Sequence, residues 1–194
     1  MPKMIWKGIT NPDFVFKTGD LPDNSQIIHV PENPMRRSVL FSIPFILLCF
    51  FVLWERLKSF SLDKPYLLIG IVLSILLCTV HELLHAIVYP KKYNAYIGII
   101  PKEFIFYMSC SAPLRKKRFI LMSLLPMILG VIPLAVFVCM PPDYRILDAI
   151  LWPMAMMGLV SPSPDYMNVY YVLKEVPRNA YIQDGENGLY WFME

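Results

Sequence analysis

The stretch that decides the fold is residues 66–89, which reads YLLIGIVLSILLCTVHELLHAIVY. Its first two thirds are almost wholly apolar, and the run is long enough to cross the hydrocarbon core of a bilayer as one helix. His81, Glu82 and His85 interrupt it near its end. Ionisable side chains at membrane depth are costly and usually serve a function. The stretch therefore predicts a transmembrane helix that carries a polar site.

The composition of the whole chain agrees with a membrane protein. Of its 194 residues, 56% are hydrophobic and only 17% are charged, and the mean hydropathy is +0.48, which is too apolar for an ordinary soluble domain. The net charge of +3 gives little support for a nucleic-acid partner, so we expect none. The four cysteines are scattered and predict free thiols. The first 35 residues are polar and rich in proline, and predict no cleavable signal peptide.

Three further apolar runs lie at about residues 38–54, 119–140 and, with interruptions, 146–173. We therefore expect an all-α membrane protein with about four transmembrane helices. A soluble bundle with buried helices is the competing interpretation, but the runs are long and uniformly apolar. The expected organisation is a polar N-terminal arm over 1–37, a transmembrane domain over 38–173 and a cytoplasmic C-terminal tail over 174–194.

Strand-forming residues gather between the second and third apolar runs. Residues 95–100, AYIGII, and residues 103–110, EFIFYMSC, flank a Pro-Lys pair and are rich in β-branched and aromatic side chains. They predict a short β-hairpin, with an apolar interfacial loop as the alternative. In the tail, QDGENG at residues 183–188 predicts a turn.

Lysine and arginine residues predict the orientation of the chain in the membrane. With four spans, the arm, the middle segment and the tail share one side and carry 14 of these residues, including Lys17 and Lys102, whereas the other side carries 4, including Lys58. Cytoplasmic segments are enriched in Lys and Arg. We therefore expect a multi-pass protein of the cell membrane with both termini in the cytoplasm.

The HELLH sequence at residues 81–85 has the spacing of a metal site. On a helix, His81 and His85 lie on one face one turn apart, so both imidazoles can reach one ion. Zinc suits neutral imidazole ligands and tolerates an open position, and it makes water acidic enough for Glu82 to act as a general base. The alternative is a set of interfacial side chains that hydrogen-bond to their neighbours or to lipid headgroups.

A catalytic zinc site usually has three protein ligands, so a third is needed. His29 lies in the polar arm, before the first span, and Asp148 lies early in the fourth run. Asp165 lies as many residues into the fourth run as the histidines lie into the second, which predicts the same depth in the membrane. Asp165 is therefore the expected third ligand. Alternatively, it caps the helix that restarts after the prolines of SPSPDY.

Asn168 follows Asp165 by one helical turn and can face the same cavity. We expect it either to bind the substrate backbone or a ligand carboxylate, or only to satisfy its helix neighbours.

The HELLH helix, the later SPSPDY segment and the strand-like region between them resemble the site-2 protease type of intramembrane zinc metalloprotease. More closely, HELLHAIVYP, LRKKRFILMSLLPMILGVIPL and VPRNAYIQDGENGLYWF are similar to a family of small bacterial zincin-type membrane peptidases of unknown function. This resemblance covers about residues 66–192. It implies that residues 38–173 form a metalloprotease-like domain.

By this resemblance, His81, His85 and Asp165 correspond to ligands of Zn²⁺ and Glu82 to the general base. Site-2 proteases commonly have Asn at the position of Ser161 and Gly at the position of Tyr166, so the chain departs from that pattern at both.

The expected function is zinc-dependent hydrolysis of peptide bonds in a membrane protein or membrane-associated peptide, at or within the lipid bilayer. Extended substrate can add as a strand to the predicted hairpin. The alternatives are a metal-binding membrane protein without catalytic activity, such as a sensor or transporter component, and an inactive protease homologue.

Overall fold

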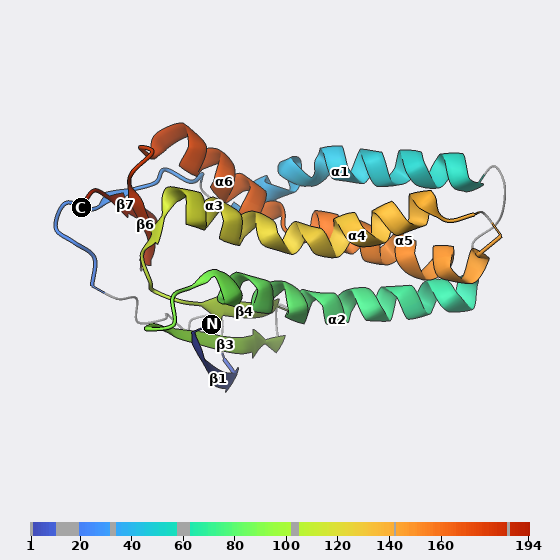
Figure 1. The fold of residues 1–194 in the computed structure, drawn as a ribbon, viewed down its shortest axis with the longest axis horizontal. Helices are drawn as coiled ribbons and strands as arrows, with labels where there is room; N and C mark the ends of the chain where they lie inside the picture. The colour runs from blue at the N-terminus through green and yellow to red at the C-terminus, as the bar shows by residue number, and fades with distance from the viewer. Residues whose placement is uncertain are drawn as a thin grey trace. The chain divides into compact units, whose positions relative to one another are not determined.

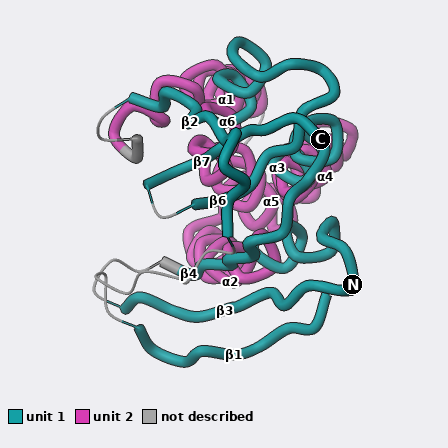
Figure 2. Tube along the Cα trace, turned by 90° about the vertical axis from the view of Figure 1, so that its left-hand side faces the viewer, with its two compact units in different colours: residues 1–32, 82–125, 168–194 teal, residues 33–81, 126–167 magenta. Residues whose placement is uncertain are grey.

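The computed structural model describes residues 2–10, 20–31, 34–57, 63–101, 105–141, 143–185 and 187–194. Lys17, Lys58 and Lys102, which contribute to the predicted orientation, lie outside these ranges. The chain divides into two compact units, each built from separate stretches of sequence (Figure 2). Unit 1 comprises residues 1–32, 82–125 and 168–194, and unit 2 comprises residues 33–81 and 126–167.

Helices account for all four predicted apolar runs (Figure 1). They are α1 (Pro34–Leu57), α2 (Lys64–Val88), α3 (Lys116–Leu124), the 3₁₀ turn η2 (Leu125–Met127), α4 (Ile128–Cys139), α5 (Arg145–Val160) and α6 (Ser163–Glu175). Among the described residues, four helical segments are long and apolar enough to cross a membrane: Arg36–Arg56, Lys64–Val88, Lys116–Cys139 and Arg145–Glu175.

The prediction of an all-α fold is wrong, because the described chain also contains two sheets with seven strands in all. These are β1 (Lys3–Ile9), β2 (Gln26–Ile27), β3 (Asn94–Ile100), β4 (Ile105–Ser109), β5 (Leu114–Arg115), β6 (Tyr181–Gly185) and β7 (Gly188–Phe192). Most of the unexpected strands come from the N-terminal arm and the C-terminal tail. β1, β2 and β5 pair with strands that are far away in the sequence, so no local pattern predicts these pairings.

The predicted hairpin is present in the first sheet, whose strand order is β1-β3-β4. β3 and β4 pair antiparallel, from Tyr96 opposite Ser109 to Ile100 opposite Ile105. The tip of this hairpin, residues 102–104, lies outside the described residues. β1 then adds in parallel along the other edge of β3, with Met4 opposite Ala95. The first sheet is therefore a hairpin extended by the arm.

The second sheet has the order β2-β7-β6-β5. β6 and β7 pair antiparallel up to Gly185 opposite Gly188, so the turn predicted at residues 183–188 joins them, although Glu186 lies outside the described residues. Gly188 has a φ of +129°, a conformation that side chains with a Cβ rarely adopt.

The core of unit 1 joins the last turns of α2 to strands and to other helix ends. Buried members include Ala86 and Val88 from α2, Phe119 and Met122 from α3, and Ile182 from β6. Burying these apolar side chains stabilises the unit by the hydrophobic effect. The packing fixes the part of α2 that carries Glu82 and His85.

In unit 2, α4 and α5 approach each other closely at two glycines. A Cβ added at Gly130 would clash with the backbone of Leu159, and one at Gly158 would clash with the backbone of Gly130. Small residues at helix interfaces allow this approach and are frequent between membrane helices.

The outer surface of the unit 2 helices is apolar. Leu47, Phe51 and Trp54 of α1 are exposed to 64%, 64% and 68%, and Leu68 and Leu76 of α2 to 63% and 60%. Soluble proteins rarely expose a continuous apolar surface of this kind. The four long apolar segments and these exposed side chains are compatible with a multi-pass membrane protein.

Candidate metal centre

His81 and His85 lie in the last two turns of α2, and both are buried. The continuous helix places them one turn apart on one face, as the spacing predicts. The boundary between the two units falls between His81 and Glu82, within this same helix. Burying an imidazole is costly unless its nitrogens have hydrogen-bond or metal partners.

Asp165 lies in the first turn of α6. α5 ends at Val160 and α6 begins at Ser163, so the chain breaks its helix at Ser161 and Pro162, where the prolines of SPSPDY are expected to interrupt it. Asp165 lies two residues inside α6 rather than directly before it, a place where the helix dipole favours a negative charge. The break therefore presents a carboxylate at the start of a new helix.

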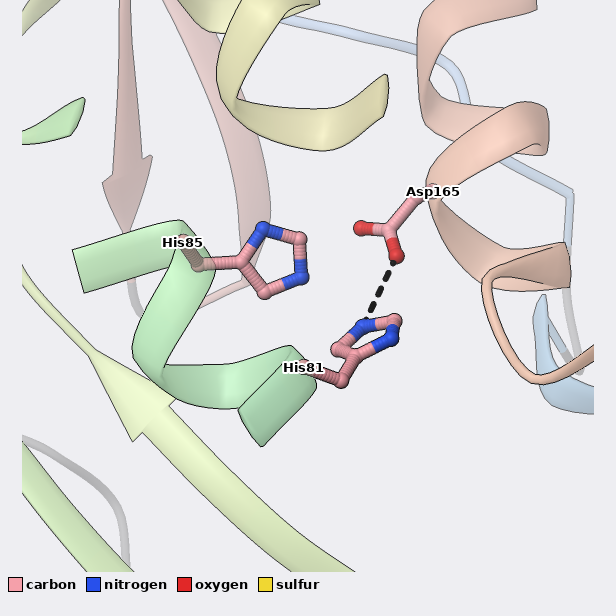
Figure 3. Close-up of side chains that lie close together, drawn as sticks. All are labelled: His81, His85 and Asp165. Atoms are coloured by element: carbon pink, nitrogen blue, oxygen red, sulfur yellow. Dashed lines mark ion pairs between the residues drawn. The ribbon is translucent and has the colours of Figure 1, made fainter. Parts of the chain in front are cut away.

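The three predicted ligands come together. The Nε2 atom of His81 lies 3.3 Å from Oδ2 of Asp165, and Figure 3 shows the histidines of α2 facing the carboxylate from α6. Each of His81, His85 and Asp165 offers one ligand atom, and these atoms all lie within 4.8 Å of one another. The set can hold a metal ion.

A backbone carbonyl orients His85. Its Nδ1 lies 2.9 Å from the carbonyl oxygen of Met122 in α3. In an uninterrupted helix this carbonyl would accept the N–H of residue 126, but that residue is Pro126, which has no N–H. The free carbonyl can accept Nδ1–H, and Nε2 then keeps its lone pair for a metal. Such a contact fixes the tautomer and the ring orientation of a ligand.

Two imidazoles and one carboxylate fit a zinc ion well. This is the donor set of catalytic zinc sites, which keep a fourth position open. Zinc bonds of about 2.0–2.1 Å in a tetrahedron put ligand atoms about 3.3 Å apart. The distance between Nε2 of His81 and Oδ2 of Asp165 has this value. The three ligand atoms together lie only within 4.8 Å of one another, so one zinc ion would draw the set closer together. The hydrogen bond between His85 and the carbonyl of Met122 is the kind of contact that orients histidine ligands in metal sites.

Glu82 lies next to His81 on α2 and is partly buried. Its Oε2 accepts a hydrogen bond of 2.8 Å from the backbone N–H of Met108 in β4. The helix that bears the histidines is therefore tied through Glu82 to the edge strand of the first sheet. This contact could not be predicted from the sequence, because it depends on how α2 and β4 pack together.

Residues of α1 support the segment around Asp165 from within unit 2. Ser38 Oγ lies 3.4 Å from Ser163 Oγ, and the ring centroids of Phe45 and Tyr166 are 4.9 Å apart. The hydroxyl of Tyr166 donates a 3.0 Å hydrogen bond to the carbonyl of Leu159 across the helix break. Tyr166 thus stabilises the break, which gives a structural role to one position where the chain departs from the site-2 protease pattern.

The other candidate ligands have different partners. His29 is largely exposed, and its backbone N–H and ring Nδ1 lie 3.0 Å and 3.3 Å from Oε2 of Glu175. Asp148 is fully buried, and its Oδ2 accepts a 3.1 Å bond from Nε of Arg56. Neither residue belongs to the metal-binding group found among the described residues.

Asn168 lies one turn after Asp165 on α6 and is partly buried. Its role in binding substrate stays a prediction.

Two side chains of the basic cluster at residues 115–118 donate hydrogen bonds to backbone carbonyls. Arg118 donates to the carbonyl of Val88 at the end of α2, at 2.7 Å, and the ammonium of Lys116 donates to the carbonyl of Val176 just after α6. Both side chains satisfy carbonyls at helix ends.

A known family matches residues 74–181, more than half of the chain, and it is described as "Putative zincin peptidase". The chain belongs to this family. The match includes HELLH, Met122 and Asp165, and it indicates a zinc metallopeptidase. No curated protein and no solved structure matches the chain significantly.

Proposed function

We propose that the chain is a zinc-dependent, membrane-embedded peptidase of the site-2 protease type that hydrolyses peptide bonds of membrane-associated substrates. The observation that carries the proposal is the meeting of His81, His85 and Asp165, with ligand atoms within 4.8 Å, beside a glutamate in HExxH spacing. Membership of the zincin family supports the same chemistry.

Each residue has a distinct role in this proposal. The two histidines and Asp165 hold the ion, which when bound supplies Lewis acidity for a carbonyl and for water. Glu82 takes a proton from water and passes it to the leaving amine. Met122 keeps His85 in the ligating tautomer through its carbonyl. Asn168 binds the substrate backbone.

The surroundings support a membrane location. Four helical segments have the length and composition of spans, and Lys and Arg residues favour a cytoplasmic location for both termini in the cell membrane. The site lies toward the C-terminal end of the α2 span, so on this topology water enters from the cytoplasmic side. The substrate is then a peptide segment that reaches the site through the lipid or along its inner surface.

Hydrolysis and metal binding are separated by replacing Glu82 with Gln, which keeps the size of the side chain and removes its basicity. We expect Glu82→Gln to retain bound zinc and to lose about 10²–10⁴-fold in cleavage of a model transmembrane substrate. His81→Ala serves as the contrasting variant, because it should lose zinc as well. Unchanged cleavage by Glu82→Gln would refute the assigned base. A zinc-loaded wild type that cleaves nothing would favour a metal-binding protein without catalytic activity.

A further inference from the structure

Basic side chains gather where three of the candidate membrane spans each have one end. These spans are Lys64–Val88, Lys116–Cys139 and Arg145–Glu175. Nε of Arg118 donates to the carbonyl of Val88 at 2.7 Å, and Nζ of Lys116 donates to the carbonyl of Val176, just after α6. The start of one span is therefore bonded to the ends of the other two. All of these bonded residues belong to unit 1 (Figure 2).

Six exposed cations lie at these bonded residues or within four residues of them. They are Lys91, Lys92, Arg115, Lys117, Arg118 and Arg178, which we call the basic group. Among the described residues, no carboxylate forms an ion pair with Lys91, Lys117 or Arg178. Nε of Arg115 donates to the hydroxyl of Tyr181 at 2.9 Å, which leaves its other N–H groups available for a ligand.

The positive charges at the start of α3 do not stabilise that helix. The helix begins with Lys116, Lys117 and Arg118, and its first turn has no acidic residue. Because the N-terminus of a helix carries a partial positive charge, cations there are unfavourable. Arg115 at the N-cap position makes no capping hydrogen bond with its side chain. A negative partner from outside the chain would offset this repulsion.

Carboxylates close to the basic group do not cancel its charge. Oε2 of Glu175 lies 3.0 Å from the backbone N–H and 3.3 Å from the ring Nδ1 of His29. The pKa of Arg115 is raised chiefly by the hydrogen bond to Tyr181, and the charge of Glu194 is the smallest of the causes. These two carboxylates against six exposed cations leave the surface positive.

We propose that the basic group binds the phosphate headgroups of anionic phospholipids. Because the spans leave the hydrocarbon at these residues, the cations lie at the level of the headgroups, where each Lys or Arg attracts an anionic membrane surface. Arginine can bind a phosphate through two parallel N–H groups, and lysine binds it as a point charge. The inference rests on the membrane location in the proposed function, and it requires neither zinc nor hydrolysis.

The test measures how strongly the full chain prefers an anionic lipid over a zwitterionic one. The protein is reconstituted in phosphatidylcholine with a trace of spin-labelled phosphatidylglycerol or spin-labelled phosphatidylcholine. The fraction of each label that the protein immobilises gives the relative association constant. Lys117→Gln/Arg178→Gln removes two exposed cations of the basic group. Lys64→Gln/Arg145→Gln is the matched control, since it removes one exposed Lys and one exposed Arg from the opposite ends of two of the same spans.

One cation near an anionic membrane surface contributes roughly a fivefold preference. We expect the wild type to prefer phosphatidylglycerol at least about fivefold, and Lys117→Gln/Arg178→Gln to lower this preference to about twofold or less. The control variant should keep the wild-type preference. Raising the ionic strength from about 0.01 M to about 1 M shortens the Debye length about tenfold and should remove most of the preference.

A wild type without a preference, an unchanged preference in Lys117→Gln/Arg178→Gln, or equal losses in the two double variants would overturn the lipid site. Millimolar glycerol phosphate should reduce the preference no more than sodium chloride of the same ionic strength does. A larger reduction would overturn the lipid site in favour of a site for a soluble anion.

Cleavage of the model transmembrane substrate is measured separately on the same preparations. The expected lipid preference without any cleavage would contradict the peptidase function and leave the lipid site. Cleavage by a wild type that has no lipid preference would contradict the lipid site alone.

Discussion

Two carboxylates in the α5–α6 segment of unit 2 have partners of different kinds. Asp148 in α5 is 0% exposed and pairs with the guanidinium of Arg56, from Nε to Oδ2 at 3.1 Å. Arg56 also donates to the carbonyl of Met140 at the end of α4. Asp165 in α6 has a side chain that is 17% exposed, and its Oδ2 lies 3.3 Å from Nε2 of His81.

The chemistry of the partner distinguishes a structural carboxylate from a metal ligand. Arginine stays protonated and has only donors, so it neutralises Asp148 and cannot bind a metal. Imidazole is mostly neutral near pH 7 and has a lone pair, so a histidine beside a carboxylate can share an ion with it. We therefore assign Asp148 to stability and Asp165 to the metal centre, although both lie in apolar helical surroundings.

The largest effect on stability should come from breaking the Asp148 pair. Asp148→Ala removes the carboxylate that neutralises the partly buried Arg56, which we expect to cost about 3–5 kcal/mol of unfolding free energy in detergent. The bound zinc per folded chain should not change. The double variant Asp148→Leu/Arg56→Met removes both charges and should recover most of the loss. A double variant as unstable as the single one would contradict a role limited to charge pairing.

In contrast to Asp148→Ala, Asp165→Ala should weaken zinc binding and leave the stability of the chain nearly unchanged. We expect a loss of zinc affinity of more than about 100-fold, because a ligand is removed where even an outer-shell contact contributes 10–100-fold. The unfolding free energy without zinc should stay close to the wild-type value. Asp143→Ala, at an exposed aspartate, is the control and should bind zinc normally. Affinity is measured by competition with a chromophoric chelator, and an unchanged value for Asp165→Ala would require another third ligand.

Zinc itself should stabilise the chain through Asp165 and not through Asp148. At a free zinc concentration of 100 times Kd, linkage predicts about 2.7 kcal/mol of added stability for the wild type. Chelation should reverse the gain. Asp165→Ala should show little of it at the same concentration. Thermal unfolding with and without zinc measures this added stability. An equal gain in the wild type and in Asp165→Ala would contradict the role of Asp165 as a metal ligand.

The smallest of these effects concerns the support of His85. Pro126→Ala restores an N–H that can compete for the carbonyl of Met122, which frees the ring of His85. We expect zinc affinity to fall about tenfold. Pro133→Ala changes a proline within α4 and should leave the affinity unchanged. Equal affinities for both variants would show that Met122 does not orient the ligand.

The sequence predicts the helices of this fold better than its sheets. Long apolar runs are sufficient to locate the spans, and the β-branched segments near Ala95 and Met108 locate the hairpin. The parallel pairing of β1 with β3 joins Met4 to Ala95 across about ninety residues, and no local periodicity encodes such a pairing. Single-sequence patterns therefore missed most of the strands.

The candidate ligands were predictable for a physical reason. HELLH fixes His81 and His85 by helical spacing, and counting residues into each span selects Asp165 over Asp148. The contacts that support these ligands were not predicted from the sequence. Pro126 is a usable signal for the free carbonyl of Met122, because a proline within a helix removes one hydrogen bond. The contact between Glu82 and Met108 depends on tertiary packing and has no such signal.

X-ray absorption at the zinc edge of the purified wild-type protein identifies the donor atoms around the bound ion. If His81, His85 and Asp165 hold one ion, the spectrum will show two imidazoles and one or two additional oxygen donors at about 2.0–2.1 Å, and no sulfur. A site with thiolate ligands, a spectrum without imidazole scattering, or a folded protein that retains no zinc would contradict the claim.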